Sequence, residues 1–234
     1  MRFGSLFSGI GGIDLGLERA GMECVWQVEI DEYCNKVLAK HWPQVERYGD
    51  VGSVGKELSD VDLIAGGFPC QDISNAHTRT KREGLAGELS GLWSQFCRVV
   101  EFMCPRWVLA ENVSAWERWV PGVRCDLWSI GYASVPIQLS AGSFGARHKR
   151  PRTFVVAHAD GDSEPLRAIH AEVASLRPVP ATRWDWGTSP SRGFRMDDGV
   201  PRGMDRCRVM GNACVPQVVE WIGRRVISSV KGPE

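Results

Sequence analysis

The chain has 234 residues, 43% of them hydrophobic and 24% charged, and its formal net charge is zero. This length suits one domain with a sizeable core, with at most a small appended module. No apolar run approaches the roughly 20 residues that cross a bilayer. The glycine-rich N-terminus lacks the form of a signal peptide, so we expect a cytoplasmic protein.

The first 30 residues follow the strand, glycine turn, helix and strand order of a βαβ unit. A predicted strand at 2–7 leads into a turn at 8–12, and a second strand at 24–28 ends in Glu29. Such a turn binds nucleotide-like ligands at a helix N-terminus, and the acid can bind ribose hydroxyls. Asp14 stands where the dinucleotide fingerprint has its third glycine, so the pattern favours an adenosine-bearing cofactor over NAD. An ordinary tight strand–helix turn is the alternative.

The stretch GGFPCQDIS at 66–74 contains the candidate nucleophile of the chain. It follows a predicted strand at 62–65, and we expect its glycine pair to adopt backbone conformations closed to other residues. Pro69 fixes the approach to Cys70. Because ligands of open α/β sheets bind outside the carboxyl ends of the strands, we interpret Cys70 as a nucleophile. The alternative is a small buried thiol that packs as a hydrophobic residue.

The polar segment 75–91 directly after this stretch has no apolar periodicity. It is either a loop that closes over a substrate or a solvated surface loop. The eight cysteines of the chain form no C-x-x-C pair, so we expect reduced thiols and no metal site. This spacing also excludes a zinc-dependent nucleobase deaminase, which needs H-x-E and P-C-x-x-C.

Helices are predicted over 31–41, 92–103 and 116–130, and an amphipathic helix follows Pro216. A buried strand at 107–110 ends in Glu111. That carboxylate would share the sheet edge of Cys70, unless it is only a capping or surface acid. Two further strands are predicted, and the residues assigned to them are 132–139 and 153–157.

Residues 158–208 are rich in Arg, Pro, Gly and Trp and show little periodicity, which predicts a small irregular insert. Over the longer range 145–208 the chain carries 12 Lys and Arg against 8 Asp and Glu, an excess of basic side chains that suits a surface contacting phosphates. Trp184 and Trp186 could stack on bases, or could form a minimal core. We therefore divide the chain into a catalytic domain at 1–157, a small target-recognition region at 158–208 and a C-terminal segment at 209–234.

Five motifs in order together resemble the DNA cytosine-5 methyltransferases. They are LFSGIGGIDLGLERAG, GGFPCQDIS, ENV, HKRPRTFVVA and RVMGNACVP, and the resemblance spans about residues 3–225. The DDGVP before the last motif is most similar to compact phage and prophage members. The resemblance implies an α/β fold: a Rossmann-like S-adenosylmethionine-dependent methyltransferase sheet with helices on both faces, plus a small irregular target-recognition insert.

The resemblance also implies a mechanism on double-stranded DNA. Cys70 would attack C6 of a flipped-out cytosine, and S-adenosylmethionine would then deliver its methyl group to C5. Glu111 would bind the N3/N4 edge of the base, Arg152 its O2, and Arg150 would help to hold the site.

Further site residues follow from the same resemblance. The implied cofactor residues are Phe7, Gly9, Ile10, Gly11, Gly12, Glu29, Ile30, Asp50, Val51, Pro69, Leu92 and Asn212. The implied DNA-binding residues are Gln71, Ser74 and Arg82. No metal or membrane is implied, and we expect a monomer that could act in a restriction–modification system.

The sequence departs from the family pattern in three ways. His148 stands where the paired-arginine motif has Gln, and only about 50 residues separate the last strand from the C-terminal motif. The family's usual motif just before that C-terminal segment is not recognisable. The alternatives are an RNA cytosine-5 methyltransferase or a catalytically silent DNA-binding protein. An NAD-dependent oxidoreductase would leave the later motifs unexplained.

Overall fold

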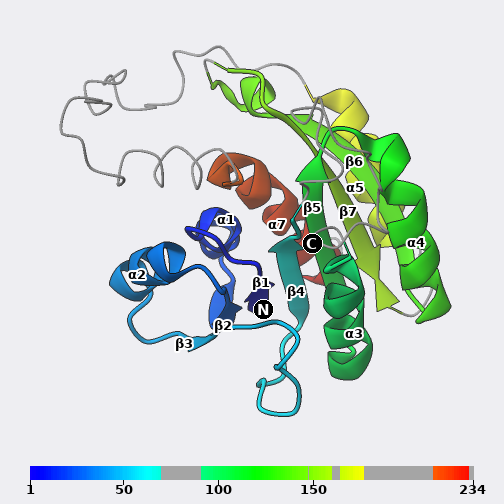
Figure 1. Cartoon of the computed structure of the whole chain (residues 1–234). Coiled ribbons are helices and arrows are strands. Elements are labelled where there is room, and N and C mark those ends of the chain that lie inside the picture. Colours follow the sequence, from blue (N-terminus) through cyan, green and yellow to red (C-terminus); the bar gives the residue numbers. More distant parts are fainter. Residues whose placement is uncertain (70–90, 147, 160–163, 177–212, 232–234) are drawn as a thin grey trace, which may run out of the picture.

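The computed structural model describes residues 1–69, 91–146, 148–159, 164–176 and 213–231. Its centre is a seven-stranded sheet with the order β3-β2-β1-β4-β5-β7-β6 (Figure 1). The strands are β1 (Arg2–Leu6), β2 (Glu23–Val28), β3 (Glu46–Tyr48), β4 (Leu63–Gly67), β5 (Trp107–Val113), β6 (Ala133–Ser140) and β7 (Pro151–His158).

Five strands are parallel, and β7 inserts antiparallel between β5 and the edge strand β6. The described helices are α1 (Gly12–Arg19), α2 (Glu32–His41), α3 (Trp93–Met103), α4 (Val120–Ser129), α5 (Glu164–Ser175) and α7 (Pro216–Lys231). Two short 3-10 helices, η2 (Trp116–Arg118) and η3 (Ala141–Phe144), also lie in the described part of the chain.

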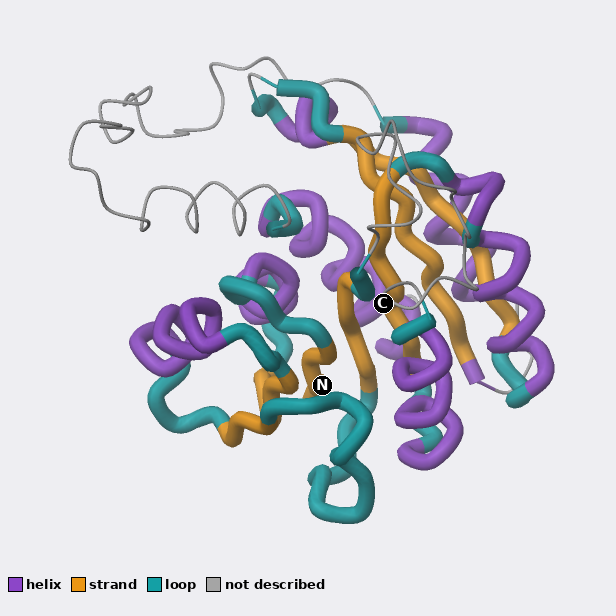
Figure 2. The backbone as a smooth tube through the Cα atoms, viewed as in Figure 1, coloured by secondary structure: helices purple, strands orange, loops and turns teal. Residues whose placement is uncertain are grey.

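Helices cover both faces of the sheet, as Figure 2 shows. Successive side chains of a strand point to opposite faces of the sheet, so alternate strand residues pack in two separate hydrophobic cores. Leu63 and Leu109 join the core under α1, α2, α5 and α7, whereas Ile64 and Val108 join the core under α3 and α4. The fold is therefore the three-layer α/β arrangement that the resemblance implied.

Helix α7 closes the structure by packing against α1. Glycines on α1 permit this close approach: a Cβ at Gly12 would lie 2.4 Å from the Cys214 carbonyl oxygen, and one at Gly16 would lie 2.6 Å from the Pro216 carbonyl oxygen. The last described segment of the chain thus lies directly on the first helix. None of the described helices combines the length and apolar character needed to cross a membrane.

The structure departs from the predicted helices and from the predicted insert in two places. The helix predicted over 116–130 is divided into η2 and α4, which has Pro121 at its N-terminal end. Residues 164–175, predicted as part of an irregular insert, form α5, which buries Leu166 and Ile169. Their spacing of three residues is the helical signal that the surrounding Arg and Pro residues obscured. The division of the chain into three regions remains a prediction.

Strands β5 and β7 are longer than predicted, and the extensions carry the charged side chains of the site. Strand β5 continues through Glu111 to Val113, and β7 begins at Pro151 and so includes Arg152. The strands were predicted from runs of apolar residues. Because the residues at these strand ends are polar, both strands were predicted too short.

Candidate active site

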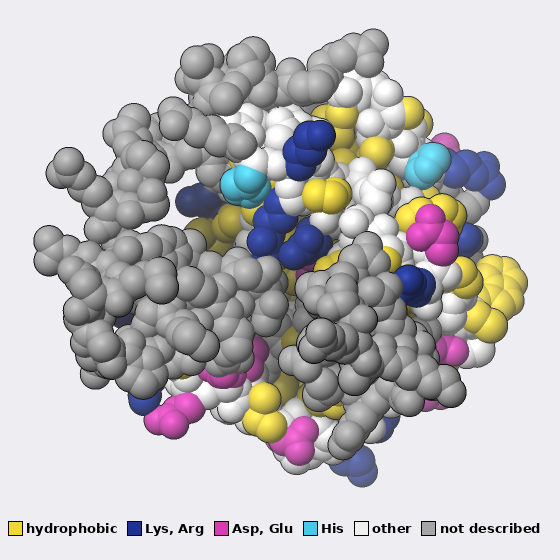
Figure 3. Space-filling view, turned by 45° about the horizontal axis from the view of Figure 1, so that its top comes forward, with side chains coloured by type: hydrophobic (Ala, Val, Ile, Leu, Met, Phe, Trp, Pro, Cys, Tyr) yellow, Lys and Arg dark blue, Asp and Glu magenta, His cyan; other side chains and the backbone are white. Residues whose placement is uncertain are grey.

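The predicted site residues that the structure describes lie along one edge of the sheet. The turns after β1, β2 and β3 and the loop after β4 all leave the carboxyl ends of parallel strands. Because β7 is antiparallel to β5, the start of β7 reaches the same edge. Basic side chains gather near the centre of this side of the molecule (Figure 3).

The turn after β1 has an unusual backbone. Phe7, Gly9 and Gly11 have positive φ angles of 54°, 57° and 81°, and Gly11 is the N-cap of α1. Such angles are strained for a side chain like that of Phe7, and strain of this kind often marks ligand sites. A Cβ at Gly9 would meet nothing within 4 Å, so the turn presents open space there.

Glu29 ties this turn to the start of α2. Its Oε2 accepts a hydrogen bond from the Gly9 backbone N–H at 2.7 Å, and its Oε1 accepts one from the Asp31 N–H at 2.8 Å. A carboxylate has about four acceptor positions, so these two bonds leave capacity for ligand hydroxyls. Ile30, the next residue, is 76% exposed, which is unusual for a large apolar side chain beside a site.

The turn after β3 is held by a residue that the sequence prediction missed. Arg98 of α3 donates to the carbonyl oxygens of Val51 at 2.7 Å and of Val54 at 3.0 Å. Val51 buries its side chain in the core, so any ligand contact falls to its backbone. Asp50 is exposed and accepts a hydrogen bond from the Gly52 N–H at 2.8 Å. The sequence signal for this role was a cationic side chain, Arg98, within one turn of the apolar face of the helix predicted over 92–103.

The two glycines at the end of β4 are needed for space, which corrects the prediction that they adopt special conformations. Neither is among the residues with positive φ. A Cβ at Gly66 would lie 2.3 Å from the Leu6 carbonyl oxygen, and one at Gly67 would lie 2.7 Å from Glu111 Oε2. Gly67 and Glu111 are partners in the β4–β5 ladder. The second glycine therefore makes room for the carboxylate.

Glu111 and Arg152 form a buried ion pair, with 3.0 Å between Oε1 and Nε. Only 8% of the Glu111 side chain and 19% of that of Arg152 is exposed. Burial raises the pKa of Glu111 to about 7, although the positive charges of Arg152 and Arg150 act in the opposite direction. A carboxyl group with this pKa can donate or accept a proton near neutral pH.

Arg150 connects this pair to the C-terminal segment. Its Nη2 donates to the Ala213 carbonyl oxygen at 2.6 Å, and its φ is 37°. Burial lowers its pKa, and the charge of Arg152 lowers it further. Arg150 is thus placed to fix the chain entering α7.

Asn112, another residue that the prediction missed, holds the start of the loop after β4. It is 2% exposed, and its Nδ2 donates to the Phe68 carbonyl oxygen at 3.1 Å. An amide in an otherwise apolar strand was the signal that could have identified it. Pro69, the last described residue before the loop, follows this contact, and half-buried Leu92 is the N-cap of α3 where the described chain resumes.

Several predicted site residues lie outside the described residues, and the structure does not test their roles. They are Cys70, Gln71, Ser74, Arg82 and Asn212. The same holds for Trp184 and Trp186 and for the loop predicted to close over a substrate. Within the described ranges, no group of three or more His, Cys, Asp or Glu side chains could hold a metal ion.

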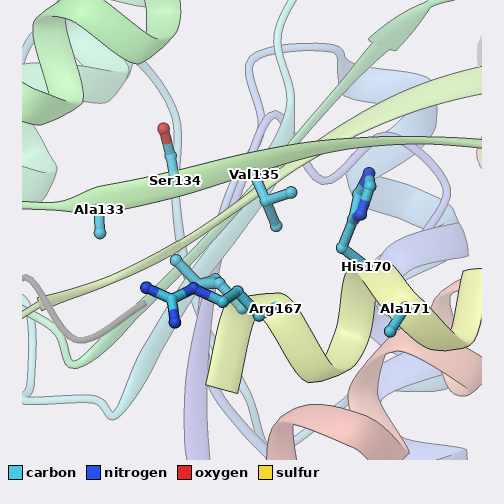
Figure 4. Close-up of a pocket in the computed structure, with 7 residues that line it drawn as sticks. Ala133, Ser134, Val135, Arg167, His170 and Ala171 are labelled. Carbon is cyan, nitrogen blue, oxygen red and sulfur yellow. The ribbon is translucent and has the colours of Figure 1, made fainter. Parts of the chain in front are cut away.

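Two hollows lie away from this edge, beside strand β6. Figure 4 shows the first, with a volume of about 270 Å³ between α5 and β6, lined by Ala133, Ser134, Val135, Leu166, Arg167, His170 and Ala171. The second, of about 460 Å³, is lined by Pro121, Arg124, Cys125, Trp128, Ala133 and Ser134. Neither contains a predicted catalytic or cofactor residue.

The sheet order and the antiparallel β7 define a Rossmann-like methyltransferase fold. A crystal structure of a prophage-encoded protein from E. coli, described as a DNA modification methyltransferase, superposes with a TM-score of 0.61 at 26% identity, covering 82% of this chain and 56% of that one. The S. pombe Dnmt2 methyltransferase shares the fold, with a TM-score of 0.58 at 22% identity over 70% of this chain and 52% of its own.

The chain belongs to the C-5 cytosine-specific DNA methylase family, whose model matches residues 1–185. The Type II methyltransferase M2.BsuMI of Bacillus subtilis is 36% identical over 67% of this chain and 42% of its own length. M.BsuFI of the same species is 31% identical over 92% of this chain and 56% of its own. The chain therefore spans about half the length of the curated relatives that it matches.

Proposed function

We propose that this protein transfers a methyl group from S-adenosylmethionine to C5 of a cytosine in double-stranded DNA, through a transient bond between Cys70 and C6. Family membership supports the reaction class. The observation that carries the proposal is the buried Glu111–Arg152 ion pair beside Gly67, three residues before Cys70. A carboxyl group there can bind a base that the thiolate attacks.

Glu111 acts on the N3 edge of the base in this proposal. Addition of a thiolate at C6 pushes electron density towards N3, and a protonated carboxyl group that donates there stabilises the developing charge. The raised pKa of about 7 keeps a substantial fraction of Glu111 protonated at neutral pH. An ordinary exposed glutamate, with a pKa near 4.3, would rarely hold that proton.

Arg152 orients the Glu111 carboxyl group and would donate to O2 of the same base. A guanidinium group presents five N–H donors in a fixed plane, so it can serve a carboxylate and a carbonyl oxygen together. Arg150 supports the same face through the Ala213 carbonyl oxygen.

Cys70 supplies the nucleophile. Its thiolate adds to C6, and the C5=C6 double bond becomes a carbon nucleophile at C5. After C5 has gained the methyl group, the C5 proton leaves to a base and the C6–S bond breaks, which regenerates both the double bond and the thiolate. These atoms are inaccessible inside a duplex, so the cytosine must leave the base stack.

The turns after β1 and β2 suit the cofactor. Gly9 combines a left-handed backbone with open space, Glu29 retains acceptor capacity for ribose hydroxyls, and the exposed Ile30 offers an apolar surface for adenine. The sulfonium compound, when bound, supplies an electrophilic methyl group. Gln71, Ser74 and Arg82 remain proposed DNA contacts.

Bisulfite sequencing of plasmid DNA from cells that express the chain tests this function. We expect protected cytosines in one sequence context with the wild type and with Cys125→Ser, a change at an exposed cysteine of α4. Cys70→Ser should leave the DNA unmodified while still binding cofactor. Unmodified DNA from a folded, cofactor-binding wild type would contradict the proposal, and RNA would then be the next substrate to assay.

A further inference from the structure

Asp14 is a buried carboxylate directly beneath the glycine turn, and the mechanism above does not use it. It lies in the first turn of α1 and has no exposed surface. Its Oδ2 accepts a hydrogen bond from Ser5 Oγ at 3.1 Å, and its Oδ1 accepts one from Gln27 Nε2 at 2.9 Å. Buried acids of this kind are rare unless they are paired or functional.

These contacts join the three elements that form the turn. Ser5 belongs to β1, Gln27 to β2 and Asp14 to α1. Ser8, the residue before Gly9, donates from its Oγ to Ser5 Oγ at 2.9 Å, which extends the network into the turn itself. No Lys or Arg has an ion pair with Asp14 among the described residues, so hydrogen bonds alone compensate its burial.

The position of this negative charge changes which ligand charge the turn favours. A helix N-terminus carries a partial positive charge and normally favours anions such as the pyrophosphate of a dinucleotide. In the dinucleotide fingerprint a glycine occupies this position and leaves that charge uncompensated. Here a carboxylate in the first turn of α1 offsets it. Burial raises the pKa of Asp14 to about 6, so the group is still mainly ionised at neutral pH.

We propose that Asp14 determines ligand specificity at the turn, by making it favour the cationic sulfonium of S-adenosylmethionine over the uncharged thioether of S-adenosylhomocysteine and over anionic dinucleotides. This inference rests on the proposed function, because it assigns the cofactor to the same turn. It gives a role to the one residue that breaks the dinucleotide fingerprint. It also means that loss of the cofactor's positive charge after methyl transfer weakens product retention.

Calorimetric titration of both ligands into the purified full chain tests this proposal. Asp14→Asn keeps the size of the side chain and removes its charge. We expect it to weaken S-adenosylmethionine binding about fivefold to tenfold and to change S-adenosylhomocysteine binding by less than about twofold. Glu18→Gln, which removes the same charge one turn further along α1, should change neither affinity.

Equal weakening of both ligands, or no change in either, would overturn the proposal. Asp14→Gly restores the fingerprint glycine and serves as a second variant, with the same selective loss expected. If both variants fail to fold while Glu18→Gln folds, Asp14 is only structural and the proposal is wrong. A wild type that folds but binds neither ligand would instead contradict the proposed function.

Discussion

The two halves of the site are built on different principles. The turn half, comprising residues 7–12, 29–31 and 50–54, consists mainly of backbone groups that Glu29 and Arg98 hold by hydrogen bonds. The strand half, comprising 66–69, 111–113 and 150–153, brings charged side chains from β5 and from the start of β7 together beside the end of β4. The first can therefore bind a ligand in a cradle of fixed shape, whereas the second can move protons. The following substitutions should affect one half and spare the other.

The largest effect is expected from Glu111→Gln, which removes the proton donor from the strand half. Loss of one preorganised donor lowers kcat by about 10²–10³-fold in enzymes that stabilise developing charge. S-adenosylhomocysteine affinity, a property of the turn half, should stay within about twofold of the wild type. Single-turnover methylation and calorimetry measure the two. A parallel loss of cofactor binding would show that the halves are not separable.

Gly67→Ala should be nearly as harmful without removing any charge. Its Cβ would lie 2.7 Å from Glu111 Oε2, so the carboxyl group has to move, and misplacement by about 1 Å can lower rates about 10²-fold. Gly55→Ala is the matched control, because the nearest atom to its Cβ lies at 3.9 Å. We expect normal kcat for that control. Wild-type kcat in Gly67→Ala would refute the spatial role of this glycine.

Arg98→Leu should affect the turn half instead. It removes charged hydrogen bonds to the Val51 and Val54 carbonyl oxygens, each of which typically contributes about 1.5–3 kcal/mol. We expect S-adenosylhomocysteine affinity to fall about tenfold, with kcat at saturating cofactor unchanged. Arg224→Ala, at an exposed i,i+4 pair on α7, controls for loss of a positive charge. A change in kcat alone would assign Arg98 to the strand half.

The pH dependence should show the smallest effect. The pKa of Glu111 is raised from 4.5 to about 7, so its protonated form is present below that value and is lost as pH rises through it. Thiolate formation favours high pH, so kcat/KM should pass through a maximum and then fall a few-fold through the Glu111 limb. The same shift means that Glu111 lowers the stability of the fold progressively as pH rises from about 4.5 to about 7. In Glu111→Gln the descending limb should vanish; its persistence would assign the limb to another group.

Sequence alone predicted much of the turn half, because its determinants are local. The glycine turn and the strand-end acid belong to one βαβ unit, in the segment from Phe7 to Glu29. Their positions in the structure agree with the predicted strand–turn–helix order. Arg98 escaped prediction because its carbonyl partners are more than 40 residues away.

The strand half was only partly predictable. Glu111 and the paired arginines were identified as candidates, but the contact between Glu111 and Gly67 depends on strand register, which a single sequence does not specify. For the same reason the glycine pair was assigned to backbone freedom instead of to space. The Asn112 contact with Phe68 likewise joins residues that are 44 positions apart. Pattern identifies candidates, and the pairing of strands decides what each one touches.

A trapping experiment tests the central claim, that Cys70 bonds to the base, most directly. With DNA carrying 5-fluorocytosine at the preferred site, the fluorine cannot leave as the C5 proton does, so the adduct persists. In the presence of S-adenosylmethionine we predict a denaturation-resistant protein–DNA complex for wild type and Cys125→Ser, attached at Cys70, and none for Cys70→Ser. Methylation of ordinary DNA without any trapped complex, or a complex through another side chain, would contradict the account.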